Sequence, residues 1–160
     1  KDEFYISGLI FLLIPYFIIL YFLIQDLIYY LKKGKIKLNT FSFYIILMLL
    51  VYLFFNVLMM VFEENNFEFF IYALYGITLL FMGILTFVMQ INFTNRTILF
   101  SGLMAASFIV SDLFFVFHKK LPDLIALKMI NVATQELSFF CYISYFIYRT
   151  KFKLYGKRTL

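Results

Sequence analysis

The sequence predicts an all-α membrane protein, a single transmembrane domain over residues 1–160 built as a polytopic bundle of five spanning helices. Of the 160 residues, 64% are hydrophobic and only 14% are charged, and the mean hydropathy is +0.94. Soluble domains carry about 25% charged residues, so much of this apolar surface must face lipid. The apolar residues also occur in runs of about 20, the length that a helix needs to cross the hydrocarbon region.

Five such runs follow one another along the chain. They are continuous, which predicts helices, because membrane strands would alternate apolar and polar residues. Pro15 lies near the middle of the first run, where the missing backbone donor is expected to kink the helix. The expected helices span residues 4–31, 41–62, 67–90, 98–117 and 124–148.

Basic residues in the loops predict the orientation of the bundle, because short cytoplasmic loops are enriched in Lys and Arg. Ten basic residues fall in the loops and tail on one side, and three fall on the other side. The N-terminus is therefore expected outside and the C-terminus inside a bacterial inner (cytoplasmic) membrane. Because the chain starts outside, without a signal segment or an initiator methionine, further helices are expected upstream of Lys1. The basic tail is interpreted as a topology determinant, with binding of anionic lipid head groups as a second possibility.

Motifs of soluble enzymes do not occur in the sequence. It has no Gly-rich phosphate loop, no Cys/His metal set and no nucleophile elbow. The net charge of +5 comes from loops and tail, which indicates membrane topology rather than nucleic-acid binding. We therefore expect no metal, no cofactor and no nucleic-acid partner. The single Cys141 excludes a disulfide framework.

The last two expected helices form a hairpin that carries most of the intramembrane polar residues. A charge within hydrocarbon costs a few kcal/mol, so such residues usually face a cavity or a partner. Asp112 and Lys128 lie at similar depths on the two antiparallel helices, so an ion pair between them is expected. This pair either neutralises two costly charges or tunes a carboxylate that handles protons.

A polar stripe follows the last helix at intervals of three and four residues, which places its members on one face. It consists of Lys128, Asn131, Gln135, Ser138, Tyr142 and Tyr145. The stripe is expected to face the bundle interior, where it either forms interhelical hydrogen bonds or lines a cavity. Glu136 lies about 100° around the helix from Gln135 and either bonds another helix or has a function. Asn56 and Tyr75 fall near the depth of Asp112 on the second and third helices.

One stretch of sequence resembles a known family. Gly102 to Ser111-Asp112-Leu113, a short Pro-containing turn and then Ala133-Thr134-Gln135 look like the C-terminal hairpin of the lysoplasmalogenase (YhhN-like) family. Family members have eight membrane helices, so the resemblance implies that these are the last five. Asn131-Val132 stands where the family has a Tyr-rich segment, and the family's N-terminal Lys-Pro and Gly-Asp motifs are absent.

The resemblance implies hydrolysis of the vinyl ether of a lysoplasmalogen, which releases a fatty aldehyde and a glycerophospho head group. The reaction needs a proton donor and an attacking water, and a carboxylic acid can supply the proton. On this basis Asp112 is expected to act as the acid–base residue, with Ser111 and Gln135 as the catalytic residues that orient water or substrate. The expected substrate-binding residues are Lys128 for the phosphate, with Asn131, Asn56, Tyr75 and Glu136.

The same residues leave open a function without catalysis. Polar and small residues also join transmembrane helices, so the chain could be a membrane subunit or sensor module that packs against other membrane proteins. The broken paired helices of many transporters are not evident. Membrane lipids are the expected partners in the first reading, and other membrane protein subunits are added in the second.

Overall fold

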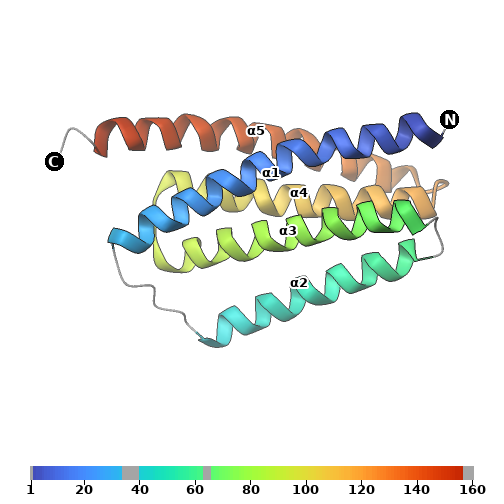
Figure 1. The fold of residues 1–160 in the computed structure, drawn as a ribbon, viewed down its shortest axis with the longest axis horizontal. Coiled ribbons are helices and arrows are strands. Elements are labelled where there is room, and N and C mark those ends of the chain that lie inside the picture. Colours follow the sequence, from blue (N-terminus) through green and yellow to red (C-terminus); the bar gives the residue numbers. More distant parts are fainter. Residues whose placement is uncertain (1, 34–39, 63–65, 157–160) are drawn as a thin grey trace. The chain divides into compact units, whose positions relative to one another are not determined.

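A computed structural model describes residues 2–33, 40–62 and 66–156, and the described residues form five α-helices (Figure 1). The helices are α1 (Asp2–Lys33), α2 (Thr40–Val61), α3 (Asn66–Asn92), α4 (Arg96–Lys120) and α5 (Ile125–Gly156). The predicted all-α class is confirmed, and each of the five expected apolar runs corresponds to one helix. α1 continues through Pro15.

Four of the described helices contain a segment long and apolar enough to cross a membrane. These segments are Leu13–Lys32, Phe41–Val61, Phe69–Asn92 and Arg96–Lys120. α2 also exposes large apolar side chains along its length, among them Phe41, Ile45, Met48, Tyr52, Phe55 and Met59. Exposed apolar surface of this extent is suited to lipid and not to water. These findings indicate an integral membrane protein.

The fifth expected span is a helix but falls short of the apolar character of the other four. α5 has 32 residues, so its length is sufficient. Its N-terminal half carries Lys128, Asn131, Gln135 and Glu136, and Arg149 and Lys151 follow near its C-terminal end. The polar residues that mark α5 as a candidate functional element are thus the same residues that lower its hydropathy.

The chain divides into two compact units, Lys1–Val88 and Met89–Leu160, which are described one at a time. In the first unit α2 runs antiparallel to α1 and α3 (Figure 1). The ring of Tyr16 on α1 packs against that of Tyr75 on α3, with centroids 4.7 Å apart. Gly76 on α3 lies against the ring of Phe54 on α2. The third helix therefore contacts both of the others through aromatic side chains.

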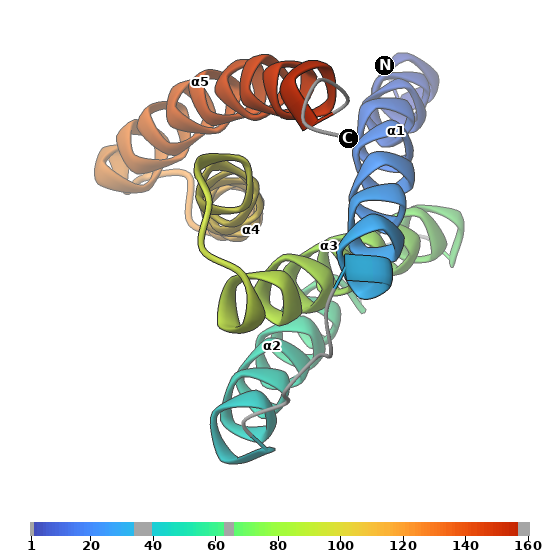
Figure 2. The same cartoon turned by 90° about the vertical axis from the view of Figure 1, so that its left-hand side faces the viewer.

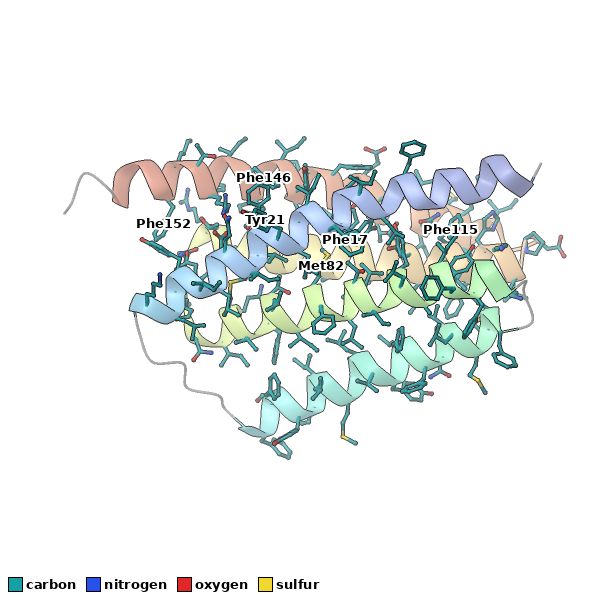
Figure 3. All side chains as sticks on the ribbon, viewed as in Figure 1. Phe17, Tyr21, Met82, Phe115, Phe146 and Phe152 are labelled. Carbon is teal, nitrogen blue, oxygen red and sulfur yellow. The ribbon has the colours of Figure 1, made fainter. Side chains whose placement is uncertain are left out.

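The second unit is a helical hairpin in which α4 and α5 lie side by side and antiparallel, as Figures 1 and 2 both show. Figure 3 labels Phe115 on α4 near the turn, and Phe146 and Phe152 on α5 near the other end. The turn is shorter than expected, because α4 continues to Lys120. The amide of Leu121 caps α4 by donating to the carbonyl of Phe117 at 2.8 Å, and Pro122 then prevents further helix.

Buried and half-buried side chains recur at alternating intervals of three and four along both helices of the hairpin. We call these two rows the hairpin seam. On α4 the row consists of Thr97, Ser101, Met104, Phe108, Ser111, Phe115 and His118. On α5 it consists of Leu127, Asn131, Thr134, Ser138, Cys141, Tyr145, Tyr148 and Phe152. A seven-residue repeat of this kind keeps one face of each helix turned toward its partner, as in coiled coils.

Several residues that predict the orientation lie outside the described residues. They are the basic residues of the loop at 34–39, the acidic pair in the segment 63–65 and the basic residues at 157–160. The predicted topology and the single domain over 1–160 therefore remain predictions.

Candidate functional site

The candidate site is built around a polar contact inside the hairpin seam. The hydroxyl of Ser111 on α4 donates a hydrogen bond to Oδ1 of Asn131 on α5, with 3.0 Å between the two oxygens. Ser111 is buried, with a relative exposure of 4% for the residue, and Asn131 is half-buried. Both residues were selected from the sequence, and the structure brings them together.

Asp112 lies beside this contact on one flank of the hairpin. It is the residue that follows the seam residue Ser111, and its side chain is half-buried. Lys128 and Gln135 hold the equivalent place on α5, since each follows a seam residue. In an antiparallel pair such positions lie on the same side of the seam, because a two-fold axis across the seam exchanges the two helices. Asp112, Lys128 and Gln135 therefore share one flank.

The expected ion pair between Asp112 and Lys128 is not formed. The side chain of Lys128 is exposed, and the part of the chain that the structure describes shows no ion pair between the two residues. Leu127 and Asn131 face α4, so Lys128 lies at the edge of the seam, where its long side chain reaches the surface instead of packing beside Asp112. The ammonium group is left at the surface of the hairpin.

The polar stripe of α5 is confirmed only in part. Asn131, Ser138, Tyr142 and Tyr145 are buried or half-buried, whereas Lys128 and Gln135 are exposed. The hairpin seam on α5 passes through Thr134 and Cys141. Gln135 follows Thr134 directly and therefore points about 100° away from it around the helix. Glu136 is exposed as well, one residue further from the seam.

Asn56 and Tyr75 belong to the first unit, and their relation to the hairpin stays a prediction. Nδ2 of Asn56 donates to the carbonyl oxygen of Tyr52 in its own helix at 2.7 Å, and the residue is exposed. Tyr75 is half-buried, and its ring packs on Tyr16. Both therefore have local structural roles within their own unit.

His118 is a feature of the seam that reasoning from the sequence missed. It follows Ser111 by seven residues, about 10 Å along the same face of α4. Among the described residues, its Nδ1 atom is buried without a hydrogen-bond partner. A buried polar atom in this state is usually satisfied by water or a ligand. The signal in the sequence was the interval of seven residues between Ser111 and His118.

The described residues contain no group of three or more His, Cys, Asp and Glu side chains placed to hold a metal ion. The site instead offers a carboxyl group at Asp112, which is suited to proton transfer, beside the polar contact of the seam. The exposed ammonium group of Lys128 is suited to binding an anion. Comparison with known proteins adds no identification, since no family model, no curated protein and no solved structure matches this chain.

Proposed function

We propose that this chain is a membrane hydrolase that cleaves the vinyl ether bond of lysoplasmalogens, as the resemblance of its hairpin to the lysoplasmalogenase (YhhN-like) family implies. The observation that carries the proposal is the hydrogen bond from Ser111 to Asn131, which joins α4 to α5 directly beside Asp112. The unpartnered Nδ1 of His118, within the described seam, supports a hydrated seam over a dry one.

The proposed reaction consumes one water. Asp112 donates a proton to the vinyl carbon distal to the ether oxygen, and the positive charge passes to the carbon bound to oxygen. Water adds to that carbon and gives a hemiacetal. The hemiacetal collapses to a fatty aldehyde, the glycerol oxygen leaves as a hydroxyl, and the proton released by water returns to the Asp112 carboxylate.

The other residues have positioning roles in this proposal. Ser111 and Gln135 orient the water or the ether oxygen, with Ser111 fixed by its bond to Asn131. The exposed ammonium of Lys128 binds the phosphate of the lyso-lipid. Glu136 on α5 is proposed to contact the bound lyso-lipid, and the expected binding roles of Asn56 and Tyr75 stay predictions from the sequence. The proposal places the α4–α5 turn on the outer side of a bacterial inner membrane, with α5 as a fifth span.

Release of aldehyde tests this function. The protein, with any helices that precede Lys1, is purified and given a lysoplasmalogen, and the aldehyde is measured with an alcohol dehydrogenase and NADH. The wild-type protein should release aldehyde, and Asp112→Asn should not. Asp123→Asn, which removes a carboxylate from the turn, is the matched control and should keep the activity. A folded wild-type protein that releases no aldehyde would sink the proposal.

A second function is favoured by a different observation. Gln135 and Glu136 are exposed on α5, and an uncovered amide and carboxyl group are costly within a membrane. A partner helix with polar side chains would satisfy them, as in a non-enzymatic membrane subunit. In that case Gln135→Leu and Glu136→Leu would release a co-purifying membrane protein, with no aldehyde formed by the wild-type complex.

A further inference from the structure

Two cations converge on one aromatic ring at the end of the hairpin remote from the turn. The guanidinium carbon of Arg96 lies 5.8 Å from the centroid of the Tyr148 ring, and Nζ of Lys151 lies 6.0 Å from the same centroid. Each cation is attracted by the ring's electron-rich face. The two cations also repel one another. Their approach to the same ring therefore leaves a concentrated positive charge beside Tyr148 that an anion would neutralise.

The ring that gathers these cations is itself held by aromatic contacts. Phe100 on α4 stacks on Tyr148, with centroids 5.2 Å apart and an angle of 8° between the ring planes. Phe100 also meets Phe140 on α5 edge to face at 6.5 Å. These rings have few rotatable bonds, so the packed ring of Tyr148 is a fixed surface. The flexible side chains of Arg96 and Lys151 are held by their contact with this fixed ring.

The beginning of α4 adds positive potential at the same point. Asn95 caps this helix, since its Oδ1 accepts from the amide of Ile98 at 2.9 Å, and Arg96 is the first helical residue. A helix N-terminus favours negative charge, yet the first turn of α4 contains no acidic residue. Within residues 89–160 the acidic side chains are Asp112, Asp123 and Glu136. All are at least about 18 Å along their helices from Arg96 or Tyr148.

Apolar side chains continue from the cations along the hairpin surface. Leu99 lies one turn after Arg96 on α4, and Ile147 lies one turn before Lys151 on α5. Both are exposed. Since α4 is a candidate membrane span that begins at Arg96, its first turn lies at the level of lipid head groups if the helix crosses the membrane. A ligand here would meet positive charge at its head and apolar surface below it.

We propose that Arg96, Lys151 and Tyr148 form a binding site for the phosphate of an anionic membrane phospholipid, whose acyl chains lie along Leu99 and Ile147. Arg presents several N–H donors to a phosphate, and Lys adds a compact charge. The apolar surface below the cations favours a phospholipid over free phosphate. The site lies at the opposite end of the hairpin from Asp112 and does not depend on the proposed hydrolysis.

The absence of tryptophan from the sequence permits a specific reporter. Tyr148→Trp keeps an aromatic ring under both cations and introduces the chain's single tryptophan. The full chain is reconstituted in nanodiscs of phosphatidylcholine with a minor share of either brominated phosphatidylglycerol or brominated phosphatidylcholine. Bromine quenches tryptophan only at short range, so the site predicts stronger quenching by the anionic lipid at equal bromine content.

Removing the cations should abolish this preference. Arg96→Gln with Lys151→Gln should lower the affinity about fivefold for each cation removed, the effect expected of one basic residue near an anionic membrane. The control, Lys119→Gln with Lys120→Gln, removes the same charge from the opposite end of the hairpin and should keep the preference. If the reporter variant does not fold, native mass spectrometry of the otherwise unsubstituted chain gives the same lipid comparison.

Three results would overturn the proposal. One is equal quenching by the two brominated lipids, and another is equal loss of preference in the two charge-deletion pairs. The third is tryptophan emission that responds to inorganic phosphate in detergent but is not quenched by brominated phosphatidylglycerol, which would assign the cations to free phosphate.

Discussion

The hydroxyl of Ser111 donates to Oδ1 of Asn131 across the α4–α5 hairpin at 3.0 Å. The two residues are twenty positions apart in the chain, and both belong to the hairpin seam. Ser101, Ser107 and Thr134 direct their hydroxyls to backbone carbonyls of their own helices. The Ser111–Asn131 contact therefore joins the two helices through polar side chains, and it fixes their register beside Asp112.

A double-mutant cycle should detect this contact. Ser111→Ala and Asn131→Ala should show a coupling energy of about 0.6 kcal/mol, the usual size for a hydrogen bond between membrane helices. The free energies of unfolding of the wild type, the two single variants and the double variant, measured in a detergent series, give this coupling energy. The control cycle pairs Asn131→Ala with Ser107→Ala, because the hydroxyl of Ser107 donates to Leu103 in its own helix at 2.7 Å. Coupling of equal size in both cycles would contradict the register.

The cap of α4 should also be measurable. Asn95 has extended backbone angles of −148° and 165°, and its side chain satisfies the amide of Ile98. Asn95→Ala should therefore destabilise the protein by about 1 kcal/mol. Thr94→Ala is the matched control, since Thr94 is exposed and precedes the cap. Thermal unfolding of the two variants decides the matter, and equal midpoints would argue against a stabilising cap.

Much of the fold could be predicted because length and hydropathy decide where a membrane helix can form. The five apolar runs needed no tertiary information, and Pro122 marked the turn. The register of α5 was harder. Gln135 and Thr134 are adjacent and both polar, and only packing against α4 selects Thr134 for the seam. Gln135 was predicted to face inward because it continues a periodic polar pattern. Which residues are buried depends also on the shape and size of their side chains, and Thr134 has the smaller one.

Ser111, Asn131 and Asp112 could be selected as candidates from the sequence, because polar residues in an apolar helix are conspicuous. Lys128 was expected to face α4 from its depth and from its place in the polar stripe. Depth does not determine the face of a helix on which a residue lies, and the stripe lies partly to one side of the seam. Cys141 is buried in the seam although it is a small, weakly polar residue that gave no signal. Such residues join a seam because they fit it.

Two glycines should differ in their tolerance of alanine. A Cβ at Gly76 would lie 2.7 Å from the ring of Phe54 on α2, and overpacking of this kind costs about 1–3 kcal/mol. A Cβ at Gly102 would overlap the end of the Gln90 side chain, which is exposed and can rotate away. Alanine also favours a helix by about 1 kcal/mol over glycine. Gly76→Ala should therefore lower the unfolding midpoint, and Gly102→Ala should leave it unchanged or raise it.

The predicted orientation can be tested at two exposed loop residues. In a Cys141→Ala background, Asp123→Cys in the α4–α5 turn should react with a membrane-impermeant maleimide in intact cells. Thr94→Cys, in the connection between α3 and α4, should react only after the membrane is opened. The reason is the excess of basic residues on the side that contains the C-terminus. Labelling of Thr94→Cys but not of Asp123→Cys in intact cells would reverse the orientation.

The role of Lys128 follows from the proposed hydrolysis and separates substrate binding from chemistry. Its ammonium group is exposed on the same flank as Asp112 and makes no ion pair with that carboxylate in the described hairpin. If it binds the phosphate of a lyso-lipid, Lys128→Gln should raise KM about tenfold, since a hydrogen bond to a charged group contributes roughly 1.5 kcal/mol. kcat should change little, because the phosphate is remote from the vinyl ether.

The control substrate is an alkenylglycerol without phosphate, on which wild type and Lys128→Gln should have equal KM. A variant that lowers kcat on both substrates would instead assign Lys128 to the chemical step, and one that changes neither constant would remove it from the site.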